Sequence, residues 1–434
     1  MDAYALQRSW DQVTTFGDQV PLYFYSHLFV SHPEVRTMFP LSMSNQRDKF
    51  VGALGRIVSH ADQIERDATF LQHLGRDHRK YAVIAEHYDV VGASLCATLM
   101  HFLGPEWDEE LAAHWTAAYQ VVARIMVEAA EMSSEASPDW WEAEVISAER
   151  RTMDLTLLTV RPHSPFQFRP GQSVSMEIPQ RPRQWRYFSP ANAPRSDGSI
   201  DLHVQQIDGG QVSPAVVRSL KAGDTVKLGA PVGERLTRRE GDPRDLLLVA
   251  GGTGLAPLLA VLEQIDNEWQ RTGIGPLVHL LHGVRMPWHL YDRPRLRQLA
   301  QTRPWFEYTE VVSDDSSYPG TRGKVGTVAA RQTLSGRTAM VCGGPQMVAH
   351  TLEQLAAAGL PPEYVKYEHF YYAAAGEHAV GPALPPGQET PSDDQQAPPR
   401  IAVPESALDS GRGLPAPDAR SRRSHGLRIP RSAG

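Results

Sequence analysis

Along the first 135 residues, apolar side chains recur every three or four positions, as in a helix that packs one face on a core. Leu95, Leu99, Phe102 and Leu103 follow this spacing. The pattern predicts an all-α domain over residues 1–135. The stretch SSEASPDWWEAE, which is rich in Ser, Pro and acidic residues, then breaks the helical period.

Two further patterns follow along the chain. Residues 138–240 contain short segments in which apolar and polar residues alternate, separated by Pro-Gly and Asp-Gly turns. Such alternation is typical of antiparallel strands, and the size favours a small β-barrel. In residues 243–372 short apolar runs alternate with helical stretches, which predicts a parallel sheet covered on both faces.

Beyond Tyr372 the composition shifts to Ala, Gly, Pro, Ser, Asp and Arg. A segment of this kind buries too little apolar surface to offset the entropy of ordering it, so residues 373–434 are predicted to be a disordered tail. Its basic end, RSRRSHGLRIPRSAG, could make a weak contact with an acidic partner. A solvated tail is the simpler interpretation.

Charge and cysteine content narrow the class of protein. The 434 residues contain 43 Lys and Arg against 50 Asp and Glu, a formal charge of −7, which argues against a nucleic-acid-binding protein. No run of eighteen apolar residues and no signal-peptide core are present, so we expect a cytoplasmic protein without membrane insertion. Cys96 and Cys342 lie in different regions, and their spacing favours neither a metal site nor a disulfide.

The segment DLLLVAGGTGLAPLLAVL, residues 245–262, joins a buried apolar run to a glycine turn and an Ala/Leu helix. This arrangement presents bare backbone N–H groups at a helix N-terminus, where a pyrophosphate can bind. GGTG lacks the full Rossmann spacing, and glycines also end strands for local reasons. The candidate nucleotide-binding residues are Gly251, Gly252, Thr253, Gly254, Ala256 and Pro257, followed by Cys342, Gly343 and Pro345 in MVCGGPQMV.

Two upstream motifs strengthen this interpretation. RYFS comprises Arg186, Tyr187, Phe188 and Ser189, and GGQVS includes Gly210, Gln211 and Ser213. GGQVS taken alone is also compatible with a plain hairpin turn. Together with the glycine turn, the two motifs predict a flavin next to a nicotinamide.

The helical region contains MFPLSMSNQRDKF and GRDHRKYAVIAEHYDVVGASLCATL. With the flavin and nucleotide motifs, the chain resembles the flavohemoglobins, globin–reductase fusions that act as nitric oxide dioxygenases, over residues 5–370. The resemblance implies haem b, FAD and NADH or NADPH as cofactors. It also implies dioxygen and nitric oxide as small-molecule substrates.

In the globin region the resemblance identifies His78 as the haem-iron ligand, with Tyr88 and a glutamate orienting its second nitrogen. An ungapped alignment places Ala130 at the glutamate position and Glu131 one residue later, a helical rotation of about 100°. Either the register slips or the proximal relay is weakened. Glu131 could equally be an exposed charge at the end of a helix.

On the opposite side of the haem, Tyr25 matches the distal tyrosine that donates a hydrogen bond to bound dioxygen, and Phe39 matches a phenylalanine that contacts the haem. A second distal polar residue is either Gln46 or Lys49. Asp77 replaces a lysine found before the proximal histidine in well-known members, a charge reversal expected to alter electron transfer.

In the reductase region the resemblance assigns Arg186 to the flavin pyrophosphate and Phe188 to the isoalloxazine. Gly210 and Ser213 would supply a second phosphate contact. YEHF resembles the closing motif of the family, with Glu368 and Phe370 near the flavin–haem junction. Arg285 and Asp292 lie where adenosine selectivity could be set, and they favour NADH weakly.

These expectations lead to an oxidoreductase that passes electrons from NAD(P)H through FAD to haem and oxidises nitric oxide to nitrate. One alternative retains the reductase but gives it another electron acceptor. A second alternative treats the globin as a sensor of dioxygen or nitric oxide.

Overall fold

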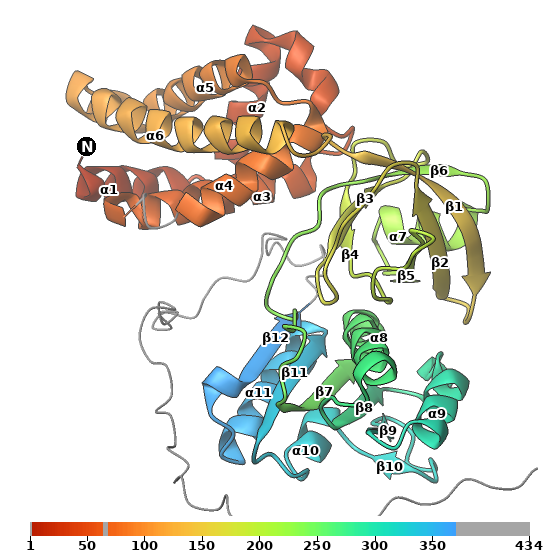
Figure 1. Cartoon of the computed structure of the whole chain (residues 1–434). Helices are drawn as coiled ribbons and strands as arrows, with labels where there is room; N and C mark the ends of the chain where they lie inside the picture. Colours follow the sequence, from red (N-terminus) through yellow and green to blue (C-terminus); the bar gives the residue numbers. More distant parts are fainter. Residues whose placement is uncertain (1, 64–67, 370–434) are drawn as a thin grey trace, which may run out of the picture. The chain divides into compact units, whose positions relative to one another are not determined.

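The structure, a computed structural model, describes residues 2–63 and 68–369 (Figure 1). The tail predicted for residues 373–434 and the candidate Phe370 lie outside the described residues. The described chain begins with helices, continues with an antiparallel sheet and ends with a parallel sheet, so the predicted fold class is confirmed for these three regions.

The helical region packs its apolar stripes into one core that includes Phe24, Leu28 and Leu99. The helices are α1 Ala3–Thr14, α2 Gln19–Ser31, α3 Ser44–Ser59, α4 Ala68–His78, α5 Ala85–Leu103 and α6 Glu109–Ser134. Asp2 and Asp108 begin α1 and α6, each with a carboxylate that accepts backbone N–H groups of the first turn.

Helix α4 approaches α6 closely because Gly75 faces it. A Cβ at Gly75 would overlap the backbone carbonyl of Met126 on α6. The helix that ends at His78 is therefore fixed against the longest helix of the region.

The antiparallel sheet has the strand order β4-β3-β6-β1-β2-β5. Its strands are β1 Trp141–Arg150, β2 Leu155–Pro162, β3 Val174–Glu177, β4 Arg186–Phe188, β5 Ile200–Gln205 and β6 Thr225–Leu228. An antiparallel bridge between Pro190 and Leu202 brings the chain after β4 to β5, so the sheet curls into a nearly closed barrel. Helix α7 (Val212–Ser219) packs on β5 and β2.

The parallel sheet has the order β10-β9-β8-β7-β11-β12. Its strands are β7 Asp245–Gly251, β8 Val278–Val284, β9 Phe306–Val312, β10 Thr321–Arg322, β11 Arg337–Gly343 and β12 Val365–His369. Its helices are α8 Leu255–Thr272, α9 Arg293–Thr302, α10 Val325–Ala329 and α11 Pro345–Ala357.

Alternate residues of β7 belong to different cores, as expected for a strand buried on both faces. Leu248 packs with α8 and α9, whereas Leu247 packs with α10 and α11. The chain proceeds from β7 to β8 on one side, while β11 pairs with the other side of β7. The carboxyl ends of β7 and β11 therefore form the switch point where parallel sheets bind nucleotides.

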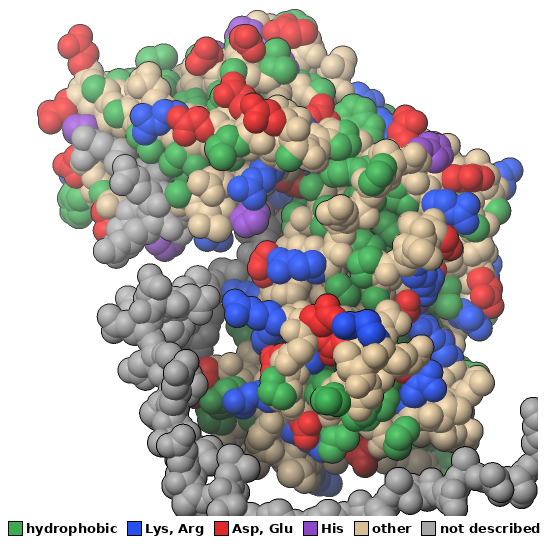
Figure 2. Space-filling view, in the orientation of Figure 1, with side chains coloured by type: hydrophobic (Ala, Val, Ile, Leu, Met, Phe, Trp, Pro, Cys, Tyr) green, Lys and Arg blue, Asp and Glu red, His purple; other side chains and the backbone are tan. Residues whose placement is uncertain are grey.

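None of the helices described between residues 2 and 369 is long and apolar enough to cross a bilayer. On the face shown in Figure 2, Lys and Arg side chains lie among those of Asp and Glu. Cytoplasmic location, the lack of nucleic-acid binding and a contact through the basic tail stay predictions from the sequence.

Candidate functional site

His78, the last residue of α4, makes the hydrogen bond expected of a metal-ligating histidine. Its Nδ1 lies 2.7 Å from the carbonyl oxygen of Leu74. Because a carbonyl only accepts, Nδ1 carries the proton and Nε2 keeps its lone pair. Burial lowers the pKa of the imidazole, which favours this neutral form. The side chain is therefore suited to bind haem iron through Nε2.

The acceptor for His78 is a backbone carbonyl, and the structure does not bring Glu131 to the imidazole. Glu131 is exposed near the end of α6, where its carbonyl accepts a hydrogen bond from Ser134. Tyr88 is partly buried, and burial raises the pKa of its phenol to about 12. Of the two open interpretations for Glu131, the geometry fits an exposed charge.

Tyr25 on α2 (Gln19–Ser31) is surrounded by aromatic rings. Its ring centroid lies 5.6 Å from that of Phe39 and 5.7 Å from that of Phe50. The hydroxyl donates to the carbonyl oxygen of Gln46 at 3.4 Å, a long bond. Burial raises the pKa of Tyr25, so the phenol stays protonated and can donate.

Gln46 and Lys49, the two distal alternatives, differ in their surroundings. Gln46 contacts Tyr25 through its backbone. The pKa of Lys49 is lowered to about 8, first by burial and then by the positive charges of Arg186 and Lys80. Lys49 is therefore close enough to Lys80 and to the barrel residue Arg186 to be affected by their positive charges.

The helical region fits a haem in a second respect. Several apolar side chains pack on the core but remain only partly buried: Phe39, Phe50, Val51, Leu54 and Leu74. Apolar side chains of this size usually bury fully in a helical core. A flat apolar macrocycle bound next to His78 would cover them.

Strand β4 carries the flavin candidates, and alternation places Arg186 and Phe188 on one face. Arg186 donates from one guanidinium nitrogen to the carbonyl of Trp185 at 2.8 Å. Ser189 is buried, with its hydroxyl 3.0 Å from that of Ser173. Tyr187, expected among the cofactor-binding residues, points the other way and donates to the Asp77 carboxylate at 2.9 Å.

The second flavin segment lies before α7. The backbone N–H of Ile207 donates to the Ser213 hydroxyl at 3.1 Å, so Ser213 closes the loop from within. Gly210 and Gln211 are exposed, and Gln211 makes no side-chain hydrogen bond to the first turn of α7. The N–H groups of that turn are therefore available to a phosphate.

The two glycine loops meet at the carboxyl ends of β7 and β11. A Cβ at Gly254 would overlap the carbonyl of Cys342, and one at Gly251 or Gly343 would overlap the side chain of Met347. Gly254 is thus required by a backbone contact within the protein, whereas at Gly251 and Gly343 the flexible end of Met347 would have to move. Gly252 has a φ of +54° and open space around its Cα, so it is the glycine whose backbone a ligand can approach.

The other candidate nucleotide-binding residues differ in how deeply they are buried. Thr253 and Pro345 are partly buried beside the loops. Ala256 and Pro257 are buried in α8, so their side chains belong to the core. Gly254 is the N-cap of α8 and no side chain caps this helix end. The N–H of Leu255 donates to the carbonyl oxygens of Gly252 and Thr253, and Pro257 has no N–H, so Ala256 supplies the N–H group of this turn that fits a pyrophosphate.

Comparison with protein families gives three consecutive matches. Residues 22–126 match the Globin family. Residues 141–236 match the oxidoreductase FAD-binding domain, and residues 248–353 match the oxidoreductase NAD-binding domain. The matches cover the helical region, the barrel and the parallel sheet in order.

A flavohemoprotein of Rhizobium meliloti (strain 1021) is 25% identical over 384 residues, which cover 82% of this chain and 93% of that protein. Over most of its length the chain is similar to flavohemoproteins, and its globin, FAD-binding and NAD-binding domains follow one another in a single chain. The ferredoxin–NAD(P)(+) reductase component of the naphthalene 1,2-dioxygenase system of Pseudomonas putida is 31% identical over 230 residues, 52% of this chain and 68% of that protein. A flavohemoglobin structure from Malassezia yamatoensis, with bound FAD and heme, shares the fold at a TM-score of 0.69 and 16% identity, covering 85% of this chain and 98% of that chain.

The three matched domains and the flavohemoprotein relatives identify the chain as an NAD(P)H-dependent oxidoreductase. It transfers electrons and uses haem, FAD and a nicotinamide nucleotide. The geometry agrees with these cofactors. The structure contains a neutral histidine, a barrel strand that carries an arginine, and two helix N-termini that no side chain caps. The individual residue roles stay predictions.

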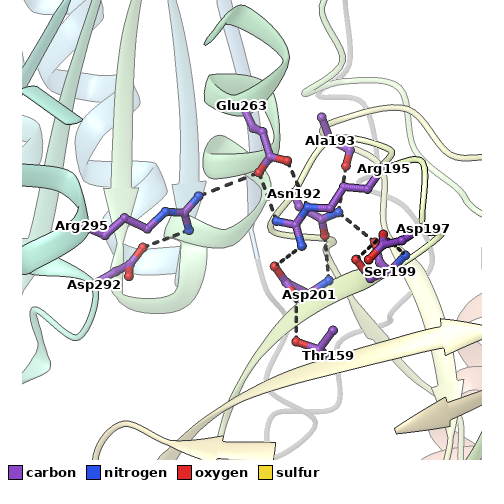
Figure 3. A network of polar contacts seen from close by, with 10 residues as sticks. All are labelled: Thr159, Asn192, Ala193, Arg195, Asp197, Ser199, Asp201, Glu263, Asp292 and Arg295. Atoms are coloured by element: carbon purple, nitrogen blue, oxygen red, sulfur yellow. Dashed lines mark hydrogen bonds and ion pairs between the residues drawn. The ribbon is translucent and has the colours of Figure 1, made fainter. Parts of the chain in front are cut away.

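A polar network between the flavohemoprotein barrel and α8 could not be seen in the sequence (Figure 3). Arg195 pairs with Asp201 on β5 at 2.8 Å and with Glu263 on α8 at 3.2 Å. Arg295 joins Glu263 at 3.8 Å and Asp292 at 3.4 Å. Asp292, expected near the adenosine, is thus buried and engaged here, whereas Arg285 is exposed just beyond β8.

Glu368 on β12 lies opposite Cys342 on β11. Burial raises the pKa of Glu368 to about 7, an effect that Arg235 partly offsets. Burial also raises the pKa of the Cys342 thiol, and the Glu368 charge adds to the effect, so the sulfur stays protonated. Below neutral pH both groups are therefore mostly uncharged.

We expect Glu368→Gln to change how stability depends on pH. Below pH 4.5 the carboxyl is protonated in both the folded and the unfolded chain. As pH rises from 4.5 to about 7, the unfolded chain ionises this carboxyl while the folded state keeps it protonated, so the folded state loses stability until the buried acid ionises as well. Glutamine removes that loss, so the free energy of unfolding of the variant should rise relative to wild type by up to about 3 kcal/mol by about pH 8.

Urea unfolding of the flavin-loaded protein at about pH 5 and about pH 8 measures this difference. Glu363→Gln is the control, because Glu363 is exposed and close in sequence. An identical pH dependence in wild type and Glu368→Gln would show that the carboxylate is ionised without cost.

Proposed function

We propose that this chain oxidises nitric oxide to nitrate with dioxygen, using electrons from NAD(P)H that pass through FAD to haem. The observation that carries the proposal is the buried phenol of Tyr25. It is protonated, lies among aromatic rings and is held by only one long hydrogen bond. Such a hydroxyl can turn toward a polar ligand bound at haem iron, because it gives up little to do so.

When bound, FAD would divide a hydride into single electrons, and haem iron would bring dioxygen to nitric oxide. Nitric oxide, dioxygen and one electron together make one nitrate anion, so one NAD(P)H supports two nitrates. The protein's part is positional. His78 presents Nε2 because its Nδ1–H donates to the carbonyl oxygen of Leu74, and the Tyr25 hydroxyl would donate a hydrogen bond toward developing negative charge.

We expect Tyr25→Phe to lower nitric oxide consumption by roughly tenfold to a hundredfold, the loss associated with one hydrogen bond to a charged group. The phenyl ring keeps the contacts with Phe39 and Phe50, so haem content should not change. A nitric oxide electrode with NADH in air measures the rate, and nitrate analysis identifies the product.

Tyr23→Phe is the matched control, because Tyr23 lies on the same helix and stacks on His101 with ring centroids 4.1 Å apart. Wild-type protein that reduces its haem but produces no nitrate from nitric oxide would reject the proposed function. Equal rates in the two variants would remove Tyr25 from the reaction.

A second function is favoured by one comparison. The reductase half is 31% identical to the naphthalene dioxygenase reductase component, above the 25% found for the whole chain against a flavohemoprotein. This half could deliver electrons to a separate protein acceptor. NADH that reduces the flavin and an added ferredoxin, but not the chain's own haem under carbon monoxide, would support this alternative.

A further inference from the structure

The two residues that follow His78 make contacts outside the globin helices. Arg79 donates to the hydroxyl of Ser133, near the end of α6, at 2.8 Å. It also pairs with Asp139, which lies beyond the end of α6, at 2.9 Å. Lys80 lies in the turn that follows α4 directly and contacts the barrel. The iron-ligand segment is therefore connected to the linker through Arg79 and to the barrel through Lys80.

Four residues form what we call the Lys80 cluster: Asp77, Lys80, Ser175 and Tyr187. The Lys80 ammonium lies 2.5 Å from the Asp77 carboxylate, 3.1 Å from the Ser175 hydroxyl on β3 and 3.4 Å from the Tyr187 hydroxyl on β4. Tyr187 also donates to Asp77 at 2.9 Å. The cluster thus joins the helical region to two barrel strands.

The surroundings of Lys80 are built to hold a cation away from water. Its side chain is 3% exposed, whereas lysines are almost never buried without a partner. The ammonium lies 5.0–5.5 Å from the ring centroids of Tyr81, Trp185 and Tyr187. A Cβ at Gly229 would overlap the Ser175 hydroxyl, so glycine at this position leaves room for the hydroxyl that contacts Lys80.

Strand β4 connects this cluster to the flavin face. Tyr187 points to Asp77 and Lys80, while Arg186 and Phe188 on either side of it face the other way. Lys80 follows His78 by two residues in a continuous turn of helix. The cluster therefore sets the distance between the iron ligand and the strand expected to hold the flavin.

We propose that the Lys80 cluster positions the barrel against the iron-ligand segment and so sets the rate at which electrons pass from flavin to haem within one chain. Lys80 and Tyr187 are positioning residues that act through the docked geometry. The inference rests on the electron-transfer activity of the family and not on nitric oxide chemistry. The cluster also compensates for Asp77, since Lys80 supplies the positive charge that the resemblance led us to expect at position 77.

The test is Lys80→Met, which keeps the length and apolar stem of the side chain but removes the ion pair and hydrogen bonds. Anaerobic mixing with NADH under carbon monoxide follows flavin and haem reduction in the same sample. We expect flavin reduction at the wild-type rate and haem reduction slowed at least about tenfold, as the loss of one charged hydrogen bond implies.

Lys227→Met is the matched control. Lys227 is also a barrel-associated lysine over an aromatic ring, 4.4 Å from the centroid of Trp140, and it pairs with Glu177 at 3.9 Å. It is more exposed and has no contact with Asp77. Its variant should reduce haem at the wild-type rate.

A second readout does not depend on turnover. If docking weakens, protease cleavage within residues 135–140, which join α6 to β1, should become at least about tenfold faster in Lys80→Met. Haem and flavin contents should stay at wild-type levels.

Wild-type rates of both haem reduction and linker cleavage in Lys80→Met would overturn the proposal. Should that variant fail to fold, Tyr187→Phe decides the question, because it removes only the hydroxyl that bonds Asp77 and Lys80. Slower haem reduction with normal flavin reduction in Tyr187→Phe supports the cluster, and wild-type haem reduction rejects it. Both measurements omit nitric oxide, so their failure is distinct from failure of the proposed function.

Discussion

His78→Ala should yield protein that lacks haem but keeps its flavin. The Leu74 carbonyl holds His78 Nδ1 at 2.7 Å, which leaves Nε2 as the iron ligand offered by α4. Alanine supplies no ligand, so the Soret band should be lost. The flavin candidates lie on the barrel, whose core is separate, so flavin absorbance per protein should not change.

Two comparisons make this expectation specific. His73→Ala removes an exposed histidine from the same helix and should retain haem. Added imidazole should restore the Soret band in His78→Ala, since it replaces the missing ligand without repairing any other contact. A Soret band of wild-type intensity in His78→Ala without imidazole would contradict the globin assignment of this residue.

The fold could be predicted because each region repeats its own period. The three- and four-residue spacing through Leu95 and Leu99 became α5, and the alternation around Leu158 and Val160 became a barrel strand. The parallel sheet could be predicted from short apolar runs such as LLLVA, since both faces of β7 are covered. The two glycine loops could be paired because the carboxyl ends of neighbouring parallel strands share one edge.

The site was predicted less completely, for physical reasons. A backbone carbonyl such as that of Leu74 has no sequence signature, so the resemblance points only to a glutamate for His78, with Glu131 as an open candidate. The strand RYF has only three residues, so its sequence does not show which side chains face the flavin. Tyr187 points away from that face and contacts Asp77. Ala256 and Pro257 follow the glycine turn but lie in the core of α8.

Contacts between regions were the least visible. Lys80 reads as a solvated charge in the sequence, because nothing local shows that three aromatic rings surround it. Arg195, which joins β5 to α8, is equally inconspicuous. Lys80 contacts Tyr187 and Arg195 contacts Glu263, each more than sixty positions away in the sequence, and local periodicity carries no information at that range.

Gly254→Ala should disrupt the nucleotide site and destabilise the parallel-sheet region. The added Cβ would overlap the carbonyl group of Cys342 and come within 2.7 Å of the Gly343 nitrogen. Both are backbone atoms at the end of a central strand, so neither can move aside as a flexible side chain could. We expect a loss of about 3 kcal/mol in the free energy of unfolding, at the upper end for overpacking.

The same movement should separate the loop after β7 from the loop after β11, so flavin reduction should require a higher NADH concentration. Thermal unfolding and the NADH dependence of flavin reduction measure the two effects. Gly55→Ala is the control, since its Cβ would meet only the Trp10 side chain at an ordinary 3.4 Å. The haem spectrum should be normal in Gly254→Ala, because its globin core contains none of these residues. Unchanged stability and NADH dependence would mean that the two loops do not pack as described, and the nucleotide site would then have to be sought elsewhere on the sheet edge.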